Sequence, residues 1–327
     1  MSAEDPLLVV DTRRIGQHGI GRYAAEILPR LSLPWTAMDT SGNPSSALDF
    51  VSKDITIAGR KPDLIYSPGY NGFLRRVPQT ITVLDLIHIS SSGSAKYRPY
   101  YDLFLKPLLK RNGHVITISE TSKNEIERWL GDDRVNVINA GMGRSPEFVP
   151  EGVAHTTDRP YFVYVGNLRP HKNVDTIVKA MRHVKGADLV VISSDSEGVA
   201  SLAAEHGVGD RVRTESNISD PRLAELYRGA RATLQPSLLE GFGLPALESA
   251  LCGTPVIFSE QCESVKEICA GGGISISGAR DASEWSAAMN SVTEGQRFPA
   301  GHVIPEDYSW DSVAATISEV LRERLPR

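Results

Sequence analysis

Short apolar runs separated by polar and glycine-containing segments recur along the whole chain, and this alternation predicts its secondary structure. Each run spans three to five residues, a length that suits a buried strand. The predicted strands are residues 7–10, 63–66, 81–84, 115–118, 135–138, 161–165, 189–192, 211–214, 232–234, 255–258 and 274–276. One helix is predicted to open in the glycine-rich segment 16–23 and to run to about residue 31, and others are predicted at 119–131, 174–184, 201–206, 220–229, 244–252, 264–269 and 309–324. Strands that alternate with helices are typical of parallel sheets covered on both faces.

The alternation is interrupted once, by a polar segment without periodicity at residues 151–159, and then restarts at Tyr161. A break of this kind predicts a domain boundary. We therefore expect an α/β fold with two Rossmann-like, doubly wound parallel-sheet domains facing a cleft, residues 1–152 and 153–306. Residues 307–327 form a C-terminal helix that is expected to return to the first domain.

Composition is that of a soluble globular protein, with 327 residues, 41% of them hydrophobic, and a net charge of −5, which argues against general nucleic-acid binding. The three cysteines include no Cys-x-x-Cys pair, so neither a disulfide framework nor a zinc site is indicated. A reducing cytoplasm is expected. The N-terminus lacks the pattern of a secretory signal, and no apolar run approaches the roughly 20 residues that span a bilayer. Any membrane contact is expected to be peripheral.

Residues 236–248 carry the strongest chemical signal, because two carboxylates, Glu240 and Glu248, flank a glycine turn between a predicted strand and a helix. Gly241 and Gly243 would let the backbone approach a ligand closely. The positive end of the helix that follows favours an anion such as a diphosphate. The two acids could therefore address opposite ends of one elongated anionic ligand.

A second loop, residues 166–173, follows the first strand of the second domain and contains Arg169, His171 and Lys172. Together with the two glutamates it suits a nucleotide diphosphate sugar. Lys172 can neutralise a leaving diphosphate. Glu248 can accept hydrogen bonds from the ribose hydroxyls, and Glu240 can hold the sugar. For Lys172 alone, a solvated loop lysine is the ordinary alternative.

The first domain offers less specific signals. Residues 16–23 form a glycine-rich loop before a helix, and Gly19 and Gly21 could cradle a phosphate or simply make a turn. Asp85 and His88 follow a strand and are candidate site residues, although His88 could equally be structural. Residues 97–111 mix basic and aromatic side chains, which fits either an anionic membrane surface or helix packing in a core.

In these motifs the sequence resembles glycosyltransferase family 4 over nearly its whole length. Glu240-Gly241-Phe242-Gly243-Leu244-Pro245 followed by Glu248 matches the family's motif of two acids separated by seven residues, and residues 252–256 continue it. Residues 166–173 and 19–23 look like the family's phosphate-binding and N-terminal glycine loops.

This resemblance implies a GT-B fold and anomeric retention, with no required metal and no cofactor beyond the nucleotide-sugar substrate. The acceptor would bind mainly on the first domain and the donor mainly on the second. The nearest branch in look is the bacterial mannosyltransferases of surface-polysaccharide synthesis. Two positions depart from the family: Leu84-Asp85 replaces a common His-Asp pair, and His171-Lys172 replaces a frequent Arg-Lys pair.

We therefore predict a retaining glycosyltransferase that moves a sugar, with mannose favoured, from a nucleotide diphosphate to a carbohydrate or lipid-linked acceptor. The alternatives are a non-catalytic sugar-nucleotide-binding or scaffold subunit, which Leu84 motivates, and another GT-B enzyme such as a phosphorylase or epimerase. No nucleic-acid partner is expected, and contact with the inner membrane surface would be peripheral. The predicted catalytic residues are Glu240, Lys172 and Asp85; the donor-binding residues are Gly19, Gly21, Gly166, Asn167, His171, Lys172, Glu240, Gly241, Phe242, Gly243, Leu244 and Glu248; acceptor or sugar contacts are His88 and Tyr23.

Overall fold

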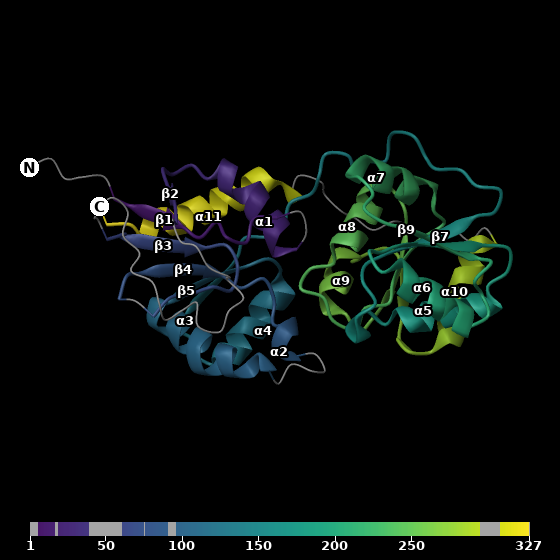
Figure 1. Ribbon diagram of the computed structural model, residues 1–327, viewed down its shortest axis with the longest axis horizontal. Coiled ribbons are helices and arrows are strands. Elements are labelled where there is room, and N and C mark those ends of the chain that lie inside the picture. The colour runs from purple at the N-terminus through teal and green to yellow at the C-terminus, as the bar shows by residue number, and fades with distance from the viewer. Residues whose placement is uncertain are drawn as a thin grey trace, which may run out of the picture. The chain divides into compact units, whose positions relative to one another are not determined.

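The computed structural model describes residues 6–16, 19–38, 61–74, 76–90, 96–294 and 308–326. The chain divides into two compact units, one formed by Met1–Gly143 with Glu306–Arg327 and the other by Arg144–Pro305. Figure 1 shows that each unit holds its own sheet with helices packed on it. Each is described separately below.

The first unit is built on a parallel sheet of six strands in the order β2-β1-β3-β4-β5-β6. Its interior strands are buried, as expected where helices cover both faces of a parallel sheet. The strands are β1 (Leu8–Val10), β2 (Thr36–Ala37), β3 (Leu64–Ser67), β4 (Gln79–Thr82), β5 (His114–Thr117) and β6 (Asn136–Asn139). The helices are α1 (Ile20–Ile27), η1 (Leu28–Arg30), α2 (Ile87–Ser90), η3 (Tyr100–Leu105), α3 (Lys106–Asn112), α4 (Glu120–Leu130) and α11 (Trp310–Arg324).

Helix α11 closes the first unit, although it follows the second unit in the sequence. It packs against α1, η1 and β3, and the ring of Trp310 meets that of Tyr23 edge to face with 6.0 Å between centroids. The Ser318 hydroxyl accepts a hydrogen bond from the Ser32 amide at 3.1 Å. A side chain at Gly143 would collide with Trp310, since a Cβ there would lie 2.2 Å from the indole. The first unit therefore needs α11 to complete its core.

The second unit contains another six-stranded parallel sheet, in the order β12-β11-β10-β7-β8-β9. Helices α5, α6 and α10 pack together, as do α7, α8 and α9 (Figure 1). The strands are β7 (Tyr161–Val165), β8 (Asp188–Ile192), β9 (Val212–Glu215), β10 (Thr233–Gln235), β11 (Val256–Ser259) and β12 (Ile274–Ile276). The helices are η4 (Pro170–Lys172), α5 (Val174–Ala180), η5 (Met181–His183), α6 (Ser196–Glu205), α7 (Asp220–Gly229), α8 (Leu244–Leu251), α9 (Glu263–Ile268) and α10 (Ala282–Thr293).

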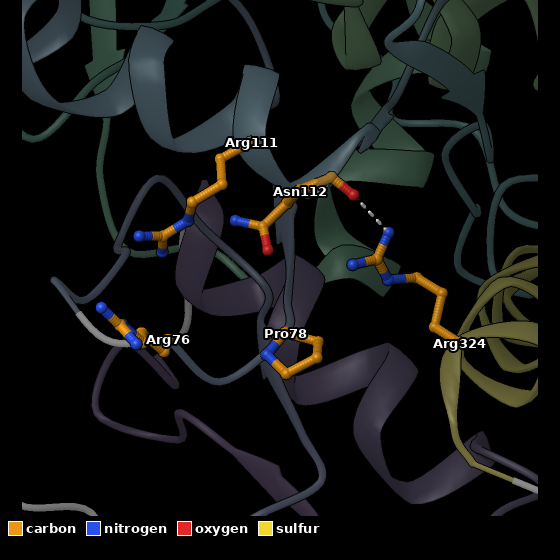
Figure 2. Close-up of a pocket in the computed structure, with 5 residues that line it drawn as sticks. All are labelled: Arg76, Pro78, Arg111, Asn112 and Arg324. Carbon is orange, nitrogen blue, oxygen red and sulfur yellow. Dashed lines mark hydrogen bonds between the residues drawn. The ribbon is translucent and has the colours of Figure 1, made fainter.

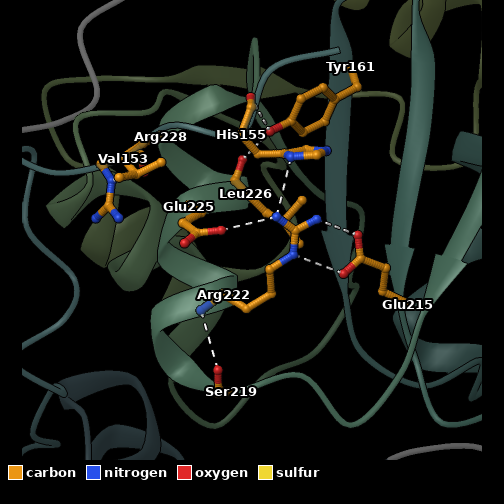
Figure 3. Close-up of polar contacts among 9 residues, drawn as sticks. All are labelled: Val153, His155, Tyr161, Glu215, Ser219, Arg222, Glu225, Leu226 and Arg228. Atoms are coloured by element: carbon orange, nitrogen blue, oxygen red, sulfur yellow. Dashed lines mark hydrogen bonds and ion pairs between the residues drawn. The ribbon is translucent and has the colours of Figure 1, made fainter.

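The second unit begins at Arg144, before the linker chosen from the sequence, because the intervening segment is bonded to α7. The Arg228 guanidinium donates to the carbonyl oxygens of Val149 and Val153 at 3.2 and 2.8 Å. Nearby, Arg222 links Glu215 at 2.9 Å and His155 at 3.3 Å, as Figure 3 shows. The polarity of this segment and its lack of periodicity suggest a free linker. In the structure, however, hydrogen bonds from Arg222 and Arg228 attach it to α7.

The predicted α/β class with two parallel sheets is confirmed, and each predicted strand has a counterpart within two residues at either end. The sequence analysis missed β2 and α10. It also offered two interpretations of residues 97–111, where the structure has a continuous helix made of η3 and α3. Pro107 lies just after the point at which the π-helical segment η3 changes to the α-helix α3.

Candidate functional site

The motifs of the second unit meet at the carboxyl edge of its sheet, where the loops after β7 and β10 lie together. The Lys172 ammonium donates to Glu240 Oε1 at 2.6 Å, which joins the two loops across 68 residues of sequence. The side chains of Lys172 and Glu240 retain 17% and 10% of their exposure, so the pair is shielded yet still reachable from solvent. A carboxylate and an ammonium at the end of parallel strands can together address a ligand with charged and hydroxyl groups.

Glu240 is held more firmly than its place on a loop suggests. Its Oε1 also accepts hydrogen bonds from Ser237 Oγ at 2.6 Å and from Gln235 Nε2 at 3.1 Å. The Ser264 hydroxyl donates to the main-chain oxygen of Glu240 at 2.9 Å. Neither Ser237 nor Gln235 was predicted as a site residue, although both stand within five positions of Glu240. Three donors on one carboxylate oxygen fix its direction before any ligand arrives.

Asn173 ties the loops together and was also missed. It adopts a left-handed backbone with φ of 53°, which asparagine tolerates better than most residues. Its side-chain amide donates to the carbonyl oxygens of Pro236 at 3.2 Å and Ala279 at 2.6 Å, and its Oδ1 accepts from Thr176 at 2.8 Å. An asparagine directly before a helix, at the end of a glycine-containing loop, was the available sequence signal.

The glycine turn leads directly into α8. Gly243 has φ of 107°, and a Cβ there would lie 2.8 Å from the Val265 side chain, so only glycine fits without strain or displacement. Within the described part of the chain, the N-cap Gly243 provides no side-chain hydrogen bond to α8, and no acid lies in the first turn of this helix. The helix N-terminus therefore keeps its partial positive charge for an anion. Gly241 and Phe242 are buried, whereas Leu244 is partly exposed beside them.

Glu248 lies on α8 and is 5% exposed. Its Oε2 accepts a hydrogen bond from the Tyr227 hydroxyl at 3.2 Å. Burial and the neighbouring carboxylate raise the pKa of Tyr227 well above its usual value, so the phenol keeps its proton and remains a donor. This contact orients Glu248, and a hydroxyl-rich ligand would have to reach it through a small opening.

The remaining predicted donor contacts line the loop after β7. Gly166 has φ of 153°, and a Cβ there would lie 2.6 Å from the Tyr164 hydroxyl. Asn167 is exposed, and its carbonyl oxygen accepts from Tyr164 at 2.8 Å. The carbonyl oxygen of His171 accepts from the Leu238 amide at 2.8 Å, which makes a second link between the two loops.

In the predicted glycine loop of the first unit, Gly21 is closely packed whereas Gly19 has open space around it. Gly19 precedes α1 with φ of 55°. A Cβ at Gly21 would lie 2.7 Å from the Gly16 nitrogen and 2.8 Å from the Arg14 oxygen, so Gly21 lets α1 approach the loop. Tyr23, expected as an acceptor or sugar contact, is instead fully buried against Trp310. The structure does not support that expectation, because the side chain points into the core.

Asp85 and His88 lie near each other after β4. The Asp85 amide donates to the Tyr70 hydroxyl at 3.0 Å, and Asp85 Oδ1 accepts from the Ile87 amide at 3.0 Å. His88 Nδ1 lies 3.2 Å from the Tyr101 hydroxyl, and its ring packs edge-on against Tyr70 at 5.4 Å between centroids. The tyrosines around these two residues were not predicted as part of a site. Leu84, which replaces the family's histidine, is 6% exposed.

No helix in the described ranges is long and apolar enough to cross a membrane. Within the same ranges, no group of three or more His, Cys, Asp or Glu side chains is arranged to hold a metal ion.

Comparison with known proteins identifies the fold. The structure superposes on the sucrose-phosphate synthase of Thermosynechococcus elongatus with a TM-score of 0.67 and 17% identity, covering 98% of this chain and 99% of that one. The fold is thus that of the GT-B glycosyltransferases. The family described as glycosyl transferases group 1 matches residues 147–300, all of which lie in the second unit.

The sequence is similar to those of two curated relatives. The O-antigen chain mannosyltransferase RfbU of Salmonella typhimurium is 28% identical over 222 residues, which cover 66% of this chain and 61% of the relative. A D-inositol 3-phosphate glycosyltransferase of Thermobispora bispora is 29% identical over 222 residues, covering 60% of this chain and 52% of the relative. The matched part of the chain thus spans little more than half the length of these relatives.

Proposed function

We propose that this protein is a retaining glycosyltransferase that transfers a sugar, with mannose favoured, from a nucleotide diphosphate sugar to a carbohydrate or lipid-linked acceptor. The observation that carries the proposal is the Lys172–Glu240 pair, 2.6 Å apart at the carboxyl edge of the second sheet beside the uncapped N-terminus of α8. The names of both relatives support the reaction class, and the name of the mannosyltransferase favours mannose as the sugar.

In this proposal, the positive charges of the site stabilise the leaving diphosphate. Cleavage of the bond between the sugar and the diphosphate leaves negative charge on the departing group. The Lys172 ammonium and the positive end of α8 both stabilise that charge. Lys172 starts in contact with Glu240, so the arriving diphosphate competes for its protons, and the carboxylate becomes available to the sugar hydroxyls.

The remaining polar groups of the site would position the donor. Glu248, held by the Tyr227 hydroxyl, accepts from the ribose, and Glu240, held by Ser237 and Gln235, accepts from the sugar. Retention follows if the acceptor attacks from the face that the diphosphate leaves and the departing phosphate takes the acceptor's proton. Asp85 and His88 of the first unit are proposed to act on the acceptor or sugar. The reaction needs no metal in this proposal, because the lysine and the helix carry the positive charge.

The test is a donor panel with a simple readout. Purified protein is incubated with GDP-mannose, UDP-glucose and other nucleotide sugars, and release of the nucleoside diphosphate is followed with and without candidate acceptors. We expect release from one preferred donor, with GDP-mannose favoured, and a product whose anomeric configuration by NMR equals that of the donor. An inverted product would refute retention.

The same panel separates the alternative. Leu84 in place of the family's histidine favours a subunit that binds a nucleotide sugar without transferring it. Saturable binding of a donor with no release of nucleoside diphosphate under any condition would support that role and refute the proposed enzyme.

A further inference from the structure

A pocket of about 380 Å³ lies in the first unit on the edge of the sheet where β4 and β5 begin. Its lining consists of Arg76, Pro78, Arg111, Asn112 and Arg324. Pro78 directly precedes β4, whereas Asp85 follows that strand, so the pocket and the candidate site residues lie at opposite ends of the parallel strands. Ligand pockets in proteins are typically about 300–1,000 Å³, and this one lies within that range.

Arg324 is fixed at this pocket by neutral acceptors. Its guanidinium donates to the carbonyl oxygen of Asn112 at 2.8 Å and to that of Gln79 at 3.3 Å, and it contacts Nδ1 of His114. Arg324 forms no ion pair with any residue in the described ranges, and its Nε is buried without a hydrogen-bond partner. Burial lowers the pKa of this arginine. A partly buried cation whose partners are all neutral retains an uncompensated charge.

Two more arginines bring their charge to the same pocket. Figure 2 shows the guanidinium groups of Arg76 and Arg111 on one side of Pro78 and that of Arg324 on the other. Both Arg76 and Arg111 are exposed, so their side chains lie on the solvent-accessible side of the pocket. Three cations from three separate segments, the turn before β4, the end of α3 and the end of α11, converge on one hollow.

We propose that this pocket binds a phosphate group, as a phosphomonoester or diphosphate. Guanidinium groups form paired hydrogen bonds with phosphate oxygens, and a phosphate can accept from several arginines at once. A phosphate presents more acceptor oxygens and more negative charge than a single carboxylate, which suits a lining with three arginines. Because the pocket lies at the opposite edge from Asp85, the bound phosphate is not a reacting group. It would anchor the first unit to a phosphorylated molecule, either a lipid headgroup or a soluble phosphate.

The first arm of the test uses inorganic phosphate and the full chain. Phosphate is titrated at constant ionic strength against a chloride reference while the ring resonances of His114 are followed by NMR. We expect a saturable shift of those resonances. Arg76→Gln and Arg111→Gln should each weaken phosphate binding roughly tenfold, because each removes a charge-assisted hydrogen bond. Arg182→Gln, an equal charge change at an exposed residue of the second unit, should leave it unaltered.

The second arm distinguishes the lipid source. Co-sedimentation is measured with vesicles of phosphatidic acid, whose headgroup is a phosphomonoester, mixed with phosphatidylcholine, and with vesicles of phosphatidylcholine alone. Binding to the anionic vesicles that falls in Arg76→Gln and Arg111→Gln, but not in Arg182→Gln, assigns the pocket to a lipid headgroup. Binding of inorganic phosphate alone, with the same sensitivity, assigns it to a soluble phosphate. The proposal is overturned if neither probe binds, or if the bound probe is insensitive to both pocket variants. Circular dichroism of each variant checks that the fold is intact.

Discussion

Removing the side chain of Asn173 should destabilise the second unit and loosen the candidate donor site. Asn173→Ala deletes two hydrogen bonds to the carbonyl oxygens of Pro236 and Ala279 and one from Thr176, all of them buried. At about 1 kcal/mol for each bond, the loss is about 3 kcal/mol. Alanine in the left-handed conformation adds about 1 kcal/mol. We therefore expect the free energy of unfolding to fall by about 4 kcal/mol.

A second variant separates the two causes. Asn173→Gly removes the same hydrogen bonds but adopts the left-handed conformation readily, so its expected loss is about 3 kcal/mol. Urea unfolding followed by tryptophan fluorescence is a suitable assay, because Trp285 lies in the core of the second unit and donates to the same Ala279 oxygen at 3.1 Å. If Asn173→Gly were as stable as the parent, the hydrogen bonds would not hold these loops and the reasoning would be refuted.

Four further outcomes are expected. Lys172→Ala should lower turnover by roughly 100-fold to 1,000-fold in steady-state assays, as for loss of one group that stabilises transition-state charge, and full activity would remove Lys172 from the mechanism. Glu248→Ala should weaken nucleotide binding in calorimetry, and unchanged affinity would exclude the ribose contact. Transfer should persist in excess EDTA, whereas its loss and recovery with a divalent ion would establish a metal requirement. Burial and the adjacent Arg324 charge lower the pKa of His114, so Arg324→Gln should raise it in an NMR titration, and an unchanged value would show that the charge does not act on the ring.

The sign of the His114 effect also sets a pH dependence. Its pKa in the folded protein lies below the usual histidine value, so the unfolded chain binds the proton more readily. The stability that the neutral ring contributes is present above the unfolded pKa of about 6.5 and is lost as the pH falls through the folded pKa. Chemical unfolding across this range should show Arg324→Gln losing less stability on acidification than the parent.

The sequence predicted every strand of the two sheets except β2. A buried parallel strand is apolar on both faces and so appears as a short apolar run, as at Tyr161–Val165. The sequence also located Glu240 and Lys172, since a glycine turn before a helix and a basic loop after a strand are local patterns. It could not locate Asn173, whose partners are the main-chain oxygens of Pro236 and Ala279, because contacts across 63 and 106 residues leave no mark in spacing.

For Tyr23, by contrast, the sequence predicted a ligand contact where the structure has a buried side chain. Its position beside a glycine loop suggested a ligand contact, yet its neighbour is Trp310, far along the chain. Local pattern cannot reveal which side of a helix a distant segment will cover. The same limit applies to the arginine pocket. Its three arginines, residues 76, 111 and 324, lie far apart in the sequence, and no local motif marks any of them as part of a site.

The packing of α11 on the first unit has a consequence for the order of events on the ribosome. The residues of the second unit are continuous, from Arg144 to Pro305, whereas the first unit requires Trp310 and the helix that follows it. Domains usually fold in the order in which they are synthesised. Here the second unit can finish folding while the part of the first unit that precedes it in the chain still exposes Tyr23 and its apolar neighbours. During translation that part stays open to non-native contacts until α11 has been made.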